Sequence, residues 1–274
     1  MRTKILPFLA LVAPLPAGAA EGPIQDNSFL VEEAYNQEEG VVQHINTFQR
    51  FRNSGDWLYT FTQEWPVGGV THQFSYTLPV VRPEGEASGI GDVALNYRYQ
   101  LVGDGEAKLA IAPRLTVLLA SGNAARGRGL GATSYQAQIP VSLVLTPTLV
   151  AHSNVGYTWT PRAKDADGNR ANLQAWSVGQ SVVWLAMQRV NFLLEAIYFR
   201  DQAVAAGGRA ISADSAFVSP GVRWSYDFPS GLQIVPGIAF PIGVGPSRHE
   251  KSVFLYLSFE HPFNEAGRRS ATAK

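Results

Sequence analysis

The segment Asp92-Val-Ala-Leu-Asn-Tyr-Arg-Tyr-Gln-Leu101 alternates between two kinds of side chain. Every second residue from Val93 to Tyr99 is apolar or aromatic, whereas the residues between them are mostly polar and include Asn96 and Arg98. Successive side chains of a β-strand point to opposite faces, so this period of two predicts a strand with one apolar and one polar face.

The same pattern recurs on both sides of this segment, in stretches of about ten residues separated by turn residues. The sequence therefore predicts twelve strands, at Val42–Phe51, Trp57–Trp65, Thr71–Val80, Asp92–Leu101, Ala107–Ala120, Thr133–Leu145, Leu149–Thr160, Asn172–Leu185, Val190–Arg200, Phe217–Phe228, Leu232–Val244 and Ser252–Phe263.

The connections between these strands indicate how they are arranged. From Pro66 onward, short connections such as Thr146–Thr148 alternate with long ones such as Ser121–Ala132; only the first hairpin, Arg52–Asp56, is short where a long one is expected. A meander whose two ends face different compartments gives this alternation, whereas a Greek-key sandwich does not. We therefore predict an all-β fold, a transmembrane antiparallel up-and-down β-barrel of about twelve strands, with a soluble β protein as the alternative.

Two further features favour the barrel. Aromatic residues gather at strand ends, as in the interfacial girdles of lipid-facing barrels: Trp57, Trp65, Tyr157, Trp159, Trp184, Phe228 and Phe263. After the N-terminal region, no apolar stretch reaches the length of a membrane-spanning helix. A closed barrel is the arrangement that satisfies every backbone group of a sheet inside a bilayer.

Composition excludes several kinds of chemistry. The 274 residues include no Cys, and 22 basic residues balance 22 acidic ones. Disulfides and thiolate sites are thereby excluded, and there is no electrostatic case for nucleic acid as a partner. We expect no cofactor.

The N-terminus predicts export. Met1–Lys4 is basic, Ile5–Pro16 is apolar and Ala17–Ala19 offers small residues for cleavage, which is the pattern of a signal peptide. We expect four regions: a signal peptide at 1–19, an acidic lead-in at 20–41, the barrel at 42–263 and a tail at 264–274. The expected location is the outer membrane of a Gram-negative-type bacterium.

Two stretches carry a resemblance to a known family. They are Ile24–Arg50 (IQDNSFLVEEAYNQEEGVVQHINTFQR) and Ser88–Leu101 (SGIGDVALNYRYQL). Both resemble a family of outer-membrane transporters named after the meta-pathway of phenol degradation. The resemblance implies a barrel that takes up small molecules, aromatic ones among them. In contrast to barrels that end on an aromatic residue, this chain continues from Phe263 through Asn264–Lys274.

The acidic lead-in has two interpretations. It carries six acids and no Lys or Arg before Arg50, and Ser28–Tyr35 has weak helical spacing. It is either a solvated periplasmic tail or a plug that folds into the barrel against basic residues. The apolar side chains of Phe29, Leu30, Val31 and Tyr35 favour docking.

Polar residues that alternate with the apolar face are expected to point into the lumen, because a charge facing lipid costs roughly 2–4 kcal/mol. The expected lumen-lining residues are His44, Arg50, Glu64, Arg98, Lys108, Arg114, Gln136, Gln138, His152, Asn154, Glu195, Arg223, Asp227 and Glu260. Their role has two interpretations, a packed and salt-bridged lumen or a pore whose arginines Arg50, Arg98, Arg114 and Arg223 attract anionic groups.

No catalytic or metal site is expected. None of the five His residues has a Ser two positions later, so the local His-and-Ser pattern of barrel lipid hydrolases is missing. Asp165–Asn169 resembles the start of a calcium loop, but Trp176 stands where the bidentate Glu is needed.

The sequence therefore predicts a channel for passive uptake of a small aromatic or amphipathic solute. The alternatives are a sealed barrel that binds a partner through its loops or N-terminus and, less favoured, a hydrolase. The expected partners are outer-membrane lipid, the solute and the barrel-insertion machinery.

Overall fold

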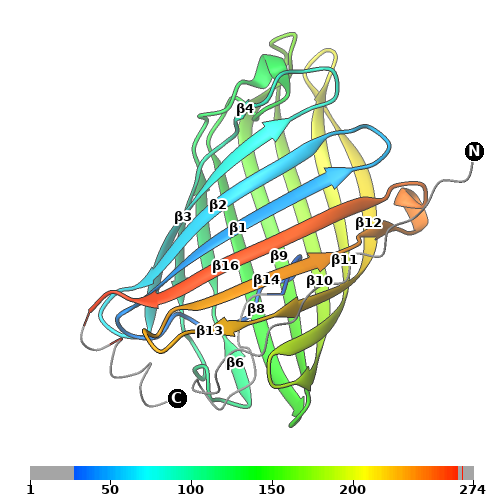
Figure 1. The fold of residues 1–274 in the computed structure, drawn as a ribbon. Coiled ribbons are helices and arrows are strands. Elements are labelled where there is room, and N and C mark those ends of the chain that lie inside the picture. The colour runs from blue at the N-terminus through cyan, green and yellow to red at the C-terminus, as the bar shows by residue number, and fades with distance from the viewer. Residues whose placement is uncertain (1–27, 265–266, 268–274) are drawn as a thin grey trace, which may run out of the picture.

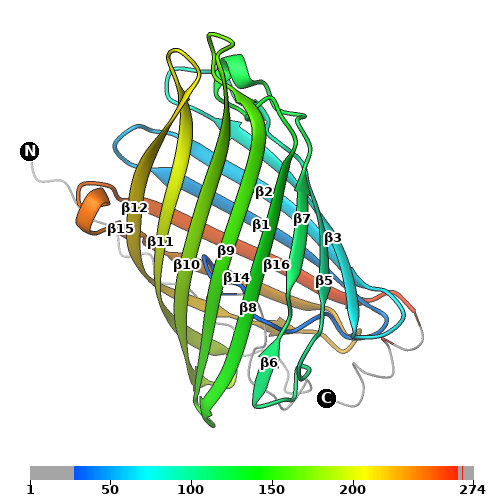
Figure 2. The same ribbon diagram turned by 180° about the vertical axis from the view of Figure 1, so that it is seen from behind.

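The computed structural model describes residues 28–264 and residue 267, and in this range the chain forms one closed antiparallel barrel (Figures 1 and 2). The predicted signal peptide, residues 20–27 of the lead-in and nearly all of the tail lie outside the described residues. Neighbours in the sheet follow one another along the chain, apart from short segments such as β4 and β6 that continue a neighbouring strand, and β16 pairs with β1 to close the sheet. Closure leaves no unpaired edge, as a bilayer requires.

The barrel has twelve strand positions around its circumference, which we call staves. Some staves consist of two consecutive numbered strand segments. The first six contain β1 Val41–Phe51, β2 Trp57–Pro66, β3 His72–Arg82, β4 Gly89–Ile90 with β5 Ala94–Tyr99, β6 Leu109–Ile111 with β7 Arg114–Leu118, and β8 Ser134–Thr146. The last six contain β9 Leu149–Lys164, β10 Arg170–Met187, β11 Val190–Ala205, β12 Arg209–Trp224 with β13 Tyr226–Asp227, β14 Gln233–Ala239 with β15 Ile242–Gly243, and β16 Ser252–Pro262.

The predicted fold class is confirmed, and each stave overlaps a predicted strand. The main difference is at the hairpin of β11 and β12. Asp201–Ala216 was expected to be a loop, but β11 continues to Ala205, and β12 begins at Arg209. Gly207 and Gly208 have positive φ angles of 76° and 72°, which allow a three-residue turn there. Backbone pairing thus continues where the alternating pattern has ended, because small and polar residues also pair in a ladder.

The outer wall is largely apolar, whereas the inner wall carries buried polar side chains beside apolar ones. Among the outward residues are some of the most exposed large apolar side chains, including Leu115, Val178, Leu194 and Leu255. Buried inward residues include Ser142, Asn154 and Glu195. Between residues 28 and 264 the helical elements are two 3-10 turns, Ala124–Arg126 and Gly245–Ser247. No helix in the described part is long and apolar enough to cross a membrane.

Candidate functional site

Residues 28–40 form an irregular segment inside the barrel, and we call them the lumen segment. Figure 1 shows this dark blue start of the described chain enclosed by the strands. Most of its side chains are buried, and Val31 and Ala34 are 1% and 0% exposed. The expected helical spacing at Ser28–Tyr35 is wrong, because this stretch has bends and no helix.

The backbone of the lumen segment is hydrogen-bonded by side chains of the barrel wall. A helix or a strand would satisfy these groups with other backbone atoms, and the closed sheet offers no free edge for pairing. Six N–H groups instead donate to five wall side chains: Leu30 and Val31 to Glu195 Oε1 (2.9 and 3.0 Å), Glu32 to Asn154 (2.7 Å), Ala34 to Ser142 (2.7 Å), Asn36 to Gln100 (2.9 Å) and Gln37 to Gln73 (2.7 Å). These side chains come from β11, β9, β8, β3 and the residue after β5, so the segment contacts much of the circumference.

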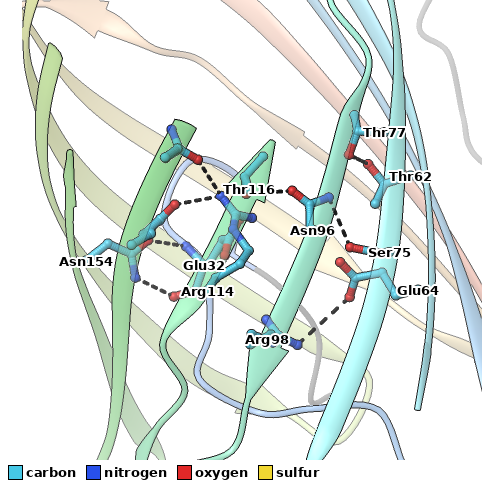
Figure 3. Close-up of polar contacts among 12 residues, drawn as sticks. Glu32, Thr62, Glu64, Ser75, Thr77, Asn96, Arg98, Arg114, Thr116 and Asn154 are labelled. Carbon is cyan, nitrogen blue, oxygen red and sulfur yellow. Dashed lines mark hydrogen bonds and ion pairs between the residues drawn. The ribbon is translucent and has the colours of Figure 1, made fainter. Parts of the chain in front are cut away.

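Arginines hold the same segment from the side of β5 and β7. Arg98 donates to the carbonyl oxygens of Tyr35 (2.6 Å) and Glu33 (3.3 Å) and to Asn36 Oδ1 (2.8 Å). Arg114 forms an ion pair with Glu32 (Figure 3). Arg98 also lies 3.9 Å from Glu64, and both side chains are buried. Charged partners in a buried setting make these contacts stronger than neutral hydrogen bonds.

An aromatic cluster anchors the beginning of the segment. The Phe29 ring lies 5.4 Å from the Tyr256 ring and 5.8 Å from the Phe254 ring, measured between centroids. Gly221 and Gly237 lie on the wall beneath it, and a Cβ atom at either position would come within 2.6 Å of the Phe29 ring. These two glycines make room for the aromatic side chain, since any larger residue would displace it.

The strand register places eleven of the predicted lumen residues on the inner face. They are Glu64, Arg98, Arg114, Gln136, Gln138, His152, Asn154, Glu195, Arg223, Asp227 and Glu260. They divide between contacts with the lumen segment, such as Glu195, and contacts within the wall, such as Asp227 with Gln233 (2.7 Å). That these residues line the path of a solute stays a prediction.

The structure corrects two of the predicted lumen residues. On β1, Gln43 and Ile45 point inward, so His44 and Arg50 are on the outer face. His44 stacks on Phe61 at 6.1 Å and on His261 at 5.4 Å, and Arg50 is exposed near the end of its strand. Both faces of β1 carry polar residues, so the alternation alone does not set its phase. Lys108 has the same parity as the inward Ala110 and is exposed just before β6, so its place in the lumen stays a prediction.

Sequence reasoning missed several residues that hold the lumen segment: Gln43, Gln73, Gln100 and Ser142. Each is an even number of positions from another inward residue of its strand, and this spacing could have identified them from the sequence. Ser142 Oγ lies 2.7 Å from His152 Nδ1 across the pair of β8 and β9. This Ser–His contact is between strands, so a search for neighbours along the sequence does not reveal it.

Above the lumen segment, toward the longer connections, the inner wall has two different sides. From β1 to β9 it carries hydroxyls and amides, with hydrogen bonds between Thr47 and Thr60 (2.6 Å), Thr62 and Thr77 (2.8 Å), and Gln136 and Thr158 (3.0 Å). Figure 3 shows part of this polar side. From β10 to β12 the inward positions include Leu173, Ile197, Phe199 and Phe217. The lumen is therefore amphipathic in cross-section.

Comparison with known proteins agrees with the fold. The COG4313 outer membrane channel from Pseudomonas putida F1 is similar to this chain with a TM-score of 0.63 at 12% sequence identity, over 83% of this chain and 97% of that chain. The NanC porin has a TM-score of 0.55 at 13% identity, over 79% of this chain and 98% of that one. No curated protein matches the sequence.

The protein is an outer-membrane β-barrel, as its closed antiparallel sheet and its apolar outer wall indicate. A family model described as "Putative MetA-pathway of phenol degradation" matches residues 23–259, which cover nearly the whole barrel and the lumen segment. The resemblance seen in two stretches of sequence is confirmed, and the chain belongs to this family of phenol-degradation MetA-pathway proteins.

Proposed function

We propose that this barrel is a channel for passive entry of a small amphipathic or aromatic solute. The observation that carries the proposal is the two-sided lumen. Hydroxyl and amide groups from Thr47 to Thr158 face an apolar side with Phe199 and Phe217. The polar group of such a solute can hydrogen-bond to the polar side while its ring packs on the apolar side. Ligand sites commonly combine a few polar groups with an apolar lining. The family and the barrel fold described above are consistent with a channel.

The lumen segment is, in this proposal, a plug that controls the channel. Its backbone is held by side-chain hydrogen bonds rather than by a β-ladder, and these can be exchanged for water or solute without opening the barrel. The Glu32 carboxylate is paired with Arg114, whereas Arg98 is engaged mainly by backbone oxygens of the segment.

A hydrolase is the less favoured reading of the Ser142–His152 contact. Both residues are buried, at 0% and 2% exposure, and Ser142 Oγ accepts the N–H of Ala34. A nucleophile needs access to substrate, and here the lumen segment covers it. The pair is better explained as part of the docking surface for the lumen segment.

Liposome swelling tests the channel. Purified protein in liposomes should admit benzenesulfonate faster than arabinose, because the ring of the first solute matches the apolar side of the lumen. Replacing Phe199 and Phe217 together with Ser should slow benzenesulfonate several-fold and leave arabinose unchanged. Phe192→Ser, on the outer face of the same strand as Phe199, is the matched control.

A barrel that admits neither solute, with its fold verified by circular dichroism, would contradict the channel and favour the sealed interaction barrel. Equal slowing of both solutes by the double variant would contradict the role of the apolar side.

A further inference from the structure

A groove on the outer wall of the barrel lies where β1 ends and β16 begins, on the opposite face of the sheet from the lumen. It is lined by Phe48, Arg50, Arg52, Val253 and Leu255 and has a volume of about 540 Å³, within the usual range of ligand sites. Phe48 pairs with Leu255 and Arg50 with Val253. These residues are on β1 and β16, which are neighbouring strands (Figure 1). We propose that this groove binds a phosphorylated glycolipid of the outer leaflet, the lipid A class.

The charges of the groove suit a phosphate. Its lining has two arginines and no acid. Lys251 extends the cluster, since its carbonyl oxygen accepts the N–H of Arg52 at 2.8 Å, and its side chain is exposed. Within the described residues, none of these three cations has an ion pair. A guanidinium binds phosphate with two parallel hydrogen bonds, so unpaired arginines at this place are well suited to a lipid phosphate.

The depth of the groove suits the boundary between headgroups and acyl chains. Arg50 lies opposite Trp57 on β2, and the Trp57 ring is 5.8 Å from that of Phe48. Trp marks the level of lipid headgroups in membrane proteins. Val253 lies opposite Arg50, and the next outward pair along the two strands, Phe48 and Leu255, is farther from the strand ends. Leu255 is 44% exposed on the lipid-facing wall. An acyl chain can therefore lie on the apolar part while the phosphate contacts the arginines.

The leaflet follows from the topology. The groove lies at the end of the barrel opposite to Val41 and Pro262, where the described barrel chain begins and ends. With these strand ends and the short turns on the periplasmic side, as the loop pattern predicts, the groove is in the outer leaflet. The lipid of that leaflet in a Gram-negative outer membrane is a glucosamine lipid with phosphates and several acyl chains. The cations and the apolar floor match both parts.

Native mass spectrometry of the detergent-solubilised protein tests the site, with lipid A, its dephosphorylated form and phosphatidylglycerol as probes. We expect lipid A to bind at least tenfold more tightly than its dephosphorylated form. Arg50→Gln with Arg52→Gln should weaken lipid A binding about tenfold. Arg170→Gln with Arg209→Gln removes the same charge from exposed positions at β10 and β12 and should change binding less than twofold. The shift in gel mobility on heating verifies that each variant is folded.

Equal loss of binding in both double variants would overturn the site in favour of general electrostatic attraction. Equal binding of lipid A and its dephosphorylated form would overturn the role of the arginines. Tighter binding of phosphatidylglycerol than of lipid A would reject the proposed lipid and point to the inner leaflet.

Discussion

The Glu195 carboxylate shows at the scale of a residue how the lumen segment is held. It is fully buried on β11, and its Oε1 atom accepts the N–H groups of both Leu30 and Val31. A buried carboxylate is stabilised by such donors and leaves them unsatisfied when it is removed. The segment, in turn, supplies donors that the wall would otherwise have to take from water.

Replacing Glu195 should therefore loosen the lumen segment. Glu195→Ala removes both hydrogen bonds, and leaving a buried donor unsatisfied costs about 1–3 kcal/mol. Glu195→Gln keeps an oxygen acceptor and is the matched control, with a smaller effect expected. Urea unfolding in detergent measures the loss of stability, and single-channel recording should show more frequent openings for the Ala variant. Identical behaviour of the Ala and Gln variants would argue against Glu195 as a holding point.

Tyr35 gives the lumen segment a dependence on alkaline pH. Burial, with a smaller effect of the charge of Glu33, raises the pKa of Tyr35 to about 12 from its ordinary value of 10.0. The docked segment thus keeps Tyr35 neutral where the unfolded chain ionises it. Its contribution is complete below pH 10.0 and is lost as the pH rises through about 12.

The stability of the wild type should therefore fall more steeply across this range than that of Tyr35→Phe, as measured by urea midpoints at several pH values. The other tyrosines are the same in both proteins, so the difference between the two curves reports Tyr35 alone. Parallel curves for the two proteins would show that Tyr35 is not buried as described.

At the scale of an element, the strands present two faces with opposite requirements. On β9, Val155 points outward and is 50% exposed, whereas Thr158 points inward and bonds Gln136. The alternation of single residues decides which positions meet hydrocarbon. This also explains why the phase error at His44 and Arg50 moved both residues to the other face together.

Charges placed on the two faces of β9 should therefore act differently. Val155→Arg puts a cation into hydrocarbon, at a cost of roughly 2–4 kcal/mol near the midplane, and should impair insertion. Thr158→Arg on the same strand keeps its charge in the polar lumen and should insert normally. The folded fraction in outer-membrane preparations, read from gel mobility with and without heating, measures the difference. Similar losses in both variants would contradict two distinct faces, and a loss confined to Thr158→Arg would mean that the faces are reversed.

The hairpin of β11 and β12 and the turn before β6 should face opposite compartments. The chain has no Cys, so single substitutions label cleanly. Ala206→Cys should react with a membrane-impermeant maleimide on intact cells, and Glu106→Cys should react only after the outer membrane is permeabilised. The reverse result would invert the barrel and place the arginine groove in the inner leaflet.

At the scale of the whole molecule, the lumen segment and the wall depend on each other. The buried wall residues Gln73, Asn154 and Glu195 use the segment as a hydrogen-bonding partner. Buried polar groups without partners are costly, so an empty lumen would have to fill with water at these positions. The lumen segment takes part in no β-ladder, so the closed sheet keeps all its backbone hydrogen bonds when the segment leaves.

Deleting residues 28–38 should raise single-channel conductance and shift selectivity toward anions. Arg98 and Arg114 lose the backbone oxygens and the carboxylate that engage them now, and they then face the pore. A synthetic peptide of residues 28–40 should restore the low conductance. Unchanged current in a folded deletion variant would reject the plug, whereas a higher current that the peptide fails to reduce would reject specific docking.

The sequence by itself determined the strands, their order and the inner or outer face of most of them. Asp92–Leu101 and Ser252–Phe263 show why, since a period of two is a local property that each strand carries alone. Only the tertiary structure decided the phase of β1, because polar residues such as Gln43 and His44 stand on both of its faces. The register of β1 against β2 and β16 places Gln43 on the inner face and His44 on the outer face.

The path of the lumen segment also came from tertiary structure alone. Its partners, from Gln73 to Glu195, are on strands far apart in the chain, and closure of the barrel brings them around one axis. The hydrophobic spacing of Ser28–Tyr35 favoured a helix when read alone. Inside the barrel the wall side chains satisfy its N–H groups, and a helix has no remaining advantage, because that advantage consists of the same hydrogen bonds.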